Sequence, residues 1–80
     1  MAKITLNELK QTFARRLRVA RRMCGRSQAE LVAKMKELAE DFPALYKSVS
    51  TTAVERYENA VMFPENSSIL VTLAEALNTN

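Results

Sequence analysis

Glycine and proline are scarce in this chain, which contains Gly25, Pro43 and Pro64 and no others among its 80 residues. These two residue types are the strongest local breakers of regular structure, so their scarcity favours helices over strands and tight turns. The stretches between them carry apolar residues at steps of three and four, the period of an amphipathic helix. We therefore expect an all-α fold, a compact bundle of four to five helices.

The first two helices each begin with the same capping signal, a serine or threonine followed three residues later by glutamate. The pairs are Thr5 with Glu8 and Ser27 with Glu30. The first helix should end at Gly25, because glycine suits the left-handed position that follows a helix. Its apolar stripe consists of Leu6, Leu9, Phe13, Leu17 and Ala20. The second helix should end before Pro43, because the residue that precedes a proline is pushed out of helical geometry.

Two shorter helices are expected in the second half of the chain. Ser50 is a good capping residue for the third, in which Val54 and Tyr57 point inward. Either Ser67 or Ser68 caps the fourth. The buried stripe of the fourth helix consists of Leu70, Leu73, Ala74 and Leu77.

Residues 41–48, between the second and third helices, read as a loop with room for one helical turn. This loop carries three large apolar side chains, Phe42, Leu45 and Tyr46. We expect them to pack on the core, because three such groups exposed together would form a patch prone to association.

The length of the chain sets the number of domains. A sequence of 80 residues can bury one small core, so residues 1–80 are expected to form a single domain. Its single cysteine, Cys24, rules out a disulfide framework, and helix packing must supply the stability, helped by any partner subunit. There is no apolar run of about 18 residues and no signal-peptide pattern. We expect a cytoplasmic protein without a membrane span.

The net charge of +3 hides a strong asymmetry between the two halves of the chain. Residues 1–36 contain ten Lys and Arg against two Glu, whereas residues 37–80 contain two against seven acidic residues. Six arginines fall within twelve residues: Arg15, Arg16, Arg18, Arg21, Arg22 and Arg26. Such a cluster is typical of a surface that meets phosphates, although a solvated helix face is the simpler alternative.

Sequence motifs for catalysis are absent. The chain has no histidine, no glycine-rich phosphate loop and no spaced cysteine pair, so we expect neither enzyme activity nor a metal or cofactor. The acidic residues Glu37, Glu40 and Asp41 are interpreted as solvated surface. Cys24 lies between Arg22 and Arg26, which is compatible with a redox-sensitive thiol, but a partly buried small side chain is the favoured interpretation.

An ordered set of residues carries a family resemblance. The set consists of Arg21, Ser27-Gln28, Glu30-Leu31, Val49-Ser50, Val54, Tyr57-Glu58-Asn59, Pro64, Leu70, Leu73-Ala74 and Ala76-Leu77. In this order it resembles the phage-repressor and Cro-type (XRE) helix-turn-helix family, over about residues 10–78. The resemblance implies a lambda-repressor-like bundle that binds double-stranded DNA and regulates transcription, as repressors do. Most such proteins act as homodimers on two half-sites about one helical turn apart.

The resemblance also implies roles for individual residues. The third helix would lie in the major groove and read bases with Thr51, Thr52 and Arg56. Residues implied to contact the DNA backbone are Gln28, Ser50, Asn59 and Arg26. Arg21 and Glu58 match an arginine and a glutamate that pair in this family and fasten the first helix to the third.

Simpler alternatives remain open for the base-contacting residues. Arg56 is also compatible with a surface arginine that pairs with Glu55 or Glu58. Thr51 and Thr52 are also compatible with residues that simply begin a helix.

The match breaks between the second and third helices. In the family about six residues separate the positions of Leu31 and Val49, with a short turn that often contains glycine, whereas here the interval is eighteen. Relative to the family pattern about twelve residues are therefore inserted, at about residues 36–48, and Ala60 replaces the glycine expected after the third helix. This departure keeps a second function open: a protein-interaction or antitoxin-like module of the same fold with weak or lost DNA binding, whose inserted segment and acidic second half bind a protein partner.

Overall fold

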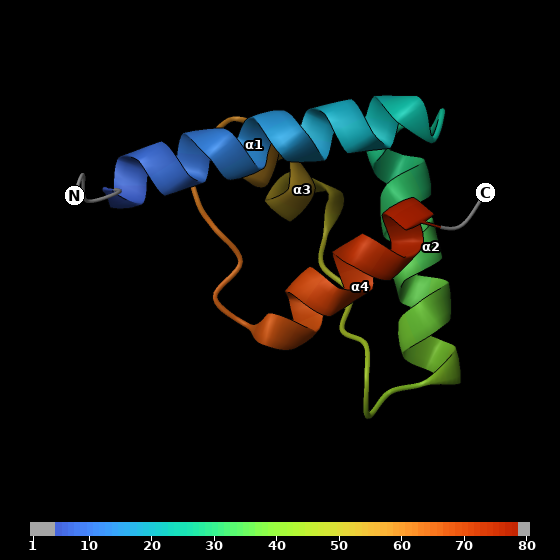
Figure 1. Ribbon diagram of the computed structural model, residues 1–80. Coiled ribbons are helices and arrows are strands. Elements are labelled where there is room, and N and C mark those ends of the chain that lie inside the picture. The colour runs from blue at the N-terminus through green and yellow to red at the C-terminus, as the bar shows by residue number, and fades with distance from the viewer. Residues whose placement is uncertain (1–4, 79–80) are drawn as a thin grey trace.

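The computed structural model describes residues 5–78 and folds them into four helices without a strand. They are α1 (Leu6–Met23), α2 (Gln28–Asp41), α3 (Thr51–Glu58) and α4 (Ser67–Asn78). Figure 1 shows α2 leaving the end of α1 at a steep angle, α3 beneath the middle of α1, and α4 crossing towards α2. Helix α3 packs on α1 and α2, and α4 packs on α2. The expectation of an all-α bundle is confirmed. None of the helices within 5–78 has both the length and the apolar character needed to cross a bilayer.

Both predicted capping boxes are present. The backbone N–H of Glu8 donates to Thr5 Oγ1 at 3.1 Å, and the N–H of Glu30 donates to Ser27 Oγ at 3.1 Å. Each glutamate accepts in return from the capping residue's N–H, at 3.4 Å in α1 and 3.0 Å in α2. The hydrogen bonds from the Ser27 backbone and hydroxyl lower the pKa of Glu30. Ser50 caps α3 as expected, accepting from the N–H of Ala53 at 3.1 Å.

The cap of α4 differs from the prediction. The helix begins at Ser67, and Asn66 precedes it with its Oδ1 accepting from the N–H of Ser68 at 2.8 Å. Asparagine is among the strongest capping residues, so neither Ser67 nor Ser68 is needed for this role.

Helices α1 and α3 end in the same hydrogen-bonded motif. After α1, the N–H groups of Gly25 and Arg26 donate to the carbonyls of Arg22 and Arg21. After α3, those of Ala60 and Val61 donate to the carbonyls of Tyr57 and Arg56. Both arrangements are Schellman motifs, which require a left-handed residue just after the helix. Gly25 takes this position with φ of 69° and Ala60 with φ of 60°, so an alanine adopts a conformation that favours glycine.

The core receives side chains from all four helices. Its buried members are Leu17, Leu31, Met35, Val54, Tyr57, Leu73 and Ala76. Phe13 packs beside this core, with its ring 4.9 Å from that of Phe63. Ala74, predicted to belong to the buried stripe of α4, is exposed. Leu6 and Leu9, predicted to belong to the buried stripe of α1, are instead 64% and 41% exposed. The reason is geometric, because the first turns of α1 extend past the other helices (Figure 1).

The connection between α2 and α3 also differs from the prediction. Helix α2 continues to Asp41, so the inserted residues 36–48 divide between its last turns and the nine-residue connection 42–50. Phe42 and Leu45 do not pack on the core; they are 54% and 59% exposed. Tyr46 is half-buried, and its ring forms a T-shaped pair with that of Phe42, with the ring centroids 6.0 Å apart. A backbone contact holds this connection instead, because the N–H of Lys47 donates to the buried Thr72 hydroxyl at 2.8 Å.

Candidate nucleic-acid interface

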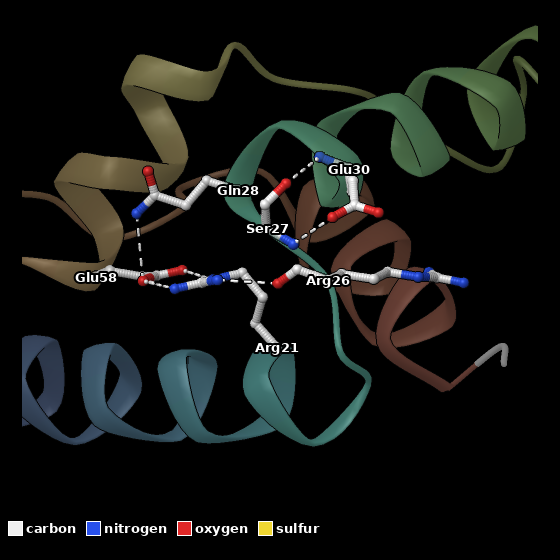
Figure 2. Close-up of polar contacts among 6 residues, drawn as sticks. All are labelled: Arg21, Arg26, Ser27, Gln28, Glu30 and Glu58. Carbon is white, nitrogen blue, oxygen red and sulfur yellow. Dashed lines mark hydrogen bonds and ion pairs between the residues drawn. The ribbon is translucent and has the colours of Figure 1, made fainter.

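A charged cluster fixes the inner side of α3. Glu58, 3% exposed, receives two hydrogen bonds from the guanidinium of Arg21: Nε to Oε2 at 2.6 Å and Nη2 to Oε1 at 3.0 Å. Figure 2 shows this fork together with the Gln28 side chain, whose Nε2 donates to Glu58 Oε1 at 3.3 Å. The third arm of Arg21, Nη1, donates to the carbonyl of Arg26 at 2.9 Å. The pairing with Glu58 raises the pKa of Arg21. The pair expected between Arg21 and Glu58 is therefore present.

This cluster determines the orientation of α3. Arg21 belongs to the last turn of α1, Gln28 to the first turn of α2, and Glu58 to the last turn of α3. Three helices therefore meet at one carboxylate, whose negative charge is compensated at the place where it is buried. Rotation of α3 about its axis would break both arms of the fork.

The outer side of α3 carries the residues predicted to read bases. Val54, Tyr57 and Glu58 are buried, whereas Thr51, Thr52, Glu55, Arg56 and Asn59 are exposed. Within residues 5–78 no ion pair joins Arg56 to Glu55, and the carboxylate of Glu58 is taken by Arg21. The guanidinium of Arg56 is thus presented to solvent.

The four residues predicted to contact the DNA backbone lie in different surroundings. Ser50 and Asn59 flank α3 at its two ends and are exposed. Gln28 turns its amide nitrogen inward to Glu58, while its amide oxygen points away from the cluster (Figure 2). Arg26 points the other way, and its Nη1 donates to the carbonyl of Ala76 in the last turn of α4. Only Arg26 is directed away from α3.

Cys24 and Arg26 together cap the carboxyl end of α4, a role that the sequence did not suggest. The thiol of Cys24 donates to the carbonyl of Leu77, next to the carbonyl that Arg26 binds. The last carbonyls of a helix lack partners within the helix and carry partial negative charge, so a cation and a thiol satisfy them. No spacing rule in the sequence could have joined these residues, because about fifty positions separate donor from acceptor.

An open groove of about 590 Å³ lies between the middle of α1 and the carboxyl end of α3. Its lining includes Gln11, Thr12, Arg15, Arg18, Asn59 and Ala60. The groove therefore brings two of the exposed arginines of α1 next to Asn59, which was predicted to hold a phosphate. The sequence contained the spacing of the arginines but not the partner that the groove gives them.

A metal site is not seen in the part of the chain that the structure describes: across residues 5–78 no three acidic, cysteine or histidine side chains lie close enough together to bind a metal ion.

Comparison of the chain with family models, with curated proteins and with solved structures found no match. Its function is therefore inferred from its own residues and their geometry.

Proposed function

We propose that this protein is a sequence-specific DNA-binding transcriptional regulator, in which α3 enters the major groove of double-stranded DNA. One observation carries the proposal: the inner face of α3 is locked by the Arg21–Glu58 pair, while its outer face presents Thr51, Thr52 and Arg56 to solvent. A rigidly held helix with an exposed polar face is what reading base edges requires.

The chemistry of the outer face suits base edges. The Arg56 guanidinium matches the two acceptors of guanine in the major groove, a contact worth about 1 to 3 kcal/mol against a wrong base. The two threonines offer a hydroxyl for base edges and a methyl group for thymine. Ser50 and Asn59 flank this face and would position it on the backbone through their hydroxyl and amide N–H donors. The Gln28 amide nitrogen already binds Glu58, so a backbone contact from Gln28 would use its second N–H.

The charge distribution supports the same proposal. Residues 1–36 carry an excess of about eight positive charges, and four of the arginines on α1 are exposed. Such a surface attracts the phosphate backbone without regard to sequence. A homodimer would place two copies of α3 on successive half-sites.

The experiment is selection of bound duplexes from a randomised library at two salt concentrations, with wild type and Arg56→Ala side by side. Arg16→Ala is the matched control, because it removes an exposed arginine of α1 that does not line the groove. We expect wild type and Arg16→Ala to share a motif that Arg56→Ala loses at one guanine. Motif-free binding that is equal in all three proteins would refute the proposal.

One observation favours a second candidate, a protein-interaction module of antitoxin type. Phe42 and Leu45 are more than half exposed on the inserted segment, and exposed apolar residues in a group mark sites where proteins bind. The same library separates the two candidates. If no motif is recovered while a double Phe42→Ser, Leu45→Ser variant becomes less prone to self-association, the inserted segment is the functional surface.

A further inference from the structure

Four polar side chains form a continuous stripe along α1. Gln11, Arg15, Arg18 and Arg22 follow one another at steps of four, three and four, which places them on one face of a helix. All four are exposed. At 1.5 Å per residue the stripe is about 16 Å long. Arg16, one position from Arg15, is turned about 100° away from this face.

A similar stripe runs along the outer side of α3. Thr52, Arg56 and Asn59 follow one another at steps of four and three, and all are exposed. Asn59, the last of them, lines the same groove as Arg15 and Arg18. The groove therefore joins the proposed base-reading face of α3 to the arginine stripe of α1.

The charge inside the groove is positive. Two carboxylates also line it, those of Glu8 and Glu58. Glu58 is neutralised by Arg21, and Glu8 accepts from the N–H of Thr5 at the start of α1. Within residues 5–78 neither Arg15 nor Arg18 takes part in an ion pair. Glu8 keeps its charge, but the two guanidinium groups of Arg15 and Arg18 outnumber it, so the lining has an excess of positive charge. Two planar guanidinium groups and an amide are a donor set that suits phosphate oxygens.

We propose that this groove holds the phosphodiester backbone of the DNA strand beside the major groove that α3 enters. Arg15 and Arg18 donate to phosphate oxygens, and the Asn59 amide donates to the same stretch of backbone. This assignment rests on the proposed function. It divides the arginine cluster into residues with different roles. Arg15 and Arg18 hold DNA, Arg21 and Arg26 hold the fold together, and Arg16 lies outside the contact.

The test measures the affinity of each protein for one duplex as a function of salt concentration. The variants are the Arg15→Gln, Arg18→Gln double variant and the single variants, with Arg16→Gln as the control that removes the same charge from the same helix. Affinity falls as salt rises, and each lost phosphate contact makes the slope of log affinity against log salt shallower by about 0.9. Between 50 and 200 mM salt the double variant should therefore lose about twelvefold less affinity than wild type does. Arg16→Gln should keep the wild-type slope.

The sequence preference supplies a second readout. Phosphate contacts carry no base information, so the double variant should keep the motif that Arg56→Ala loses. If the double variant keeps the wild-type slope and still selects a motif, the groove assignment is wrong and the proposed function stands. Equal slope changes for Arg15→Gln, Arg18→Gln and Arg16→Gln would also overturn it, because a diffuse field would then explain the binding. A wild-type protein that binds no duplex would end both proposals.

Discussion

The alanine that ends α3 offers a direct measure of backbone strain. Ala60 has φ of 60°, and Gly25 has φ of 69° in the equivalent place after α1. The left-handed conformation costs a residue with a Cβ about 1 to 2 kcal/mol. Replacing alanine by glycine also raises the entropy of the unfolded chain, which costs about 0.4 to 1 kcal/mol. Ala60→Gly should therefore stabilise the protein by about 0.5 to 1 kcal/mol.

The reverse substitution should have the reverse effect. A Cβ built on Gly25 meets no atom within 4 Å, so Gly25→Ala adds backbone strain without a steric clash. We expect it to destabilise the protein by about 0.5 to 1 kcal/mol. Ala33→Gly is the control for Ala60→Gly, because Ala33 is an exposed alanine inside α2. There the same chemical change should cost about 1 kcal/mol.

The assay is thermal and urea unfolding followed by circular dichroism. For a chain of this size 1 kcal/mol corresponds to about 4 to 8 °C in Tm, so the rise expected for Ala60→Gly is readily separated from the falls expected for Gly25→Ala and Ala33→Gly. If Ala60→Gly lowers Tm as Ala33→Gly does, the strain assigned to Ala60 is wrong.

Two further predictions concern buried polar contacts. Thr72→Val should lower the free energy of unfolding by about 1 to 3 kcal/mol, because it leaves the N–H of Lys47 without its acceptor. Thr72→Ser keeps the hydroxyl and serves as the control. If urea unfolding finds Thr72→Ser less stable than Thr72→Val, the hydrogen bond is not the cause. Glu58→Ala should cost about 3 to 5 kcal/mol, because the guanidinium left behind is largely buried. Arg56→Ala is its control on the exposed face of α3, and equal losses of stability for the two variants would argue against an anchoring role for Glu58.

Local signals in the sequence predicted local features of the fold. The capping boxes of α1 and α2, the Ser50 cap and the left-handed Gly25 each depend on residues within a few positions of one another. The Arg21–Glu58 pair was predicted across 37 positions only because a family resemblance supplied it. Neither periodicity nor propensity contains information about such a long-range partner.

The errors in predicted burial have a common physical origin. The apolar stripe of the first helix and the apolar residues of the connection were expected to be buried, but Leu6 and Leu9 extend beyond the core and Phe42 and Leu45 lie exposed on the inserted connection. Burial depends on where other elements end, which the pattern of a single segment does not contain. The groove between α1 and α3 was missed for the same reason, since its two walls come from segments about forty residues apart.

The long connection between α2 and α3 need not disturb the proposed DNA-binding face. Lengthening a turn from about four residues to nine costs roughly 0.7 kcal/mol in loop-closure entropy. The contact of Lys47 with Thr72 offsets a cost of that size, since a hydrogen bond is worth about 0.5 to 1.5 kcal/mol net. The relative placement of the two helices depends instead on Gln28 and Arg21, which bind Glu58 from α2 and α1. The buried Glu58 carboxylate, together with the core shared by α2 and α3, thus fixes the two helices relative to each other without a tight turn between them.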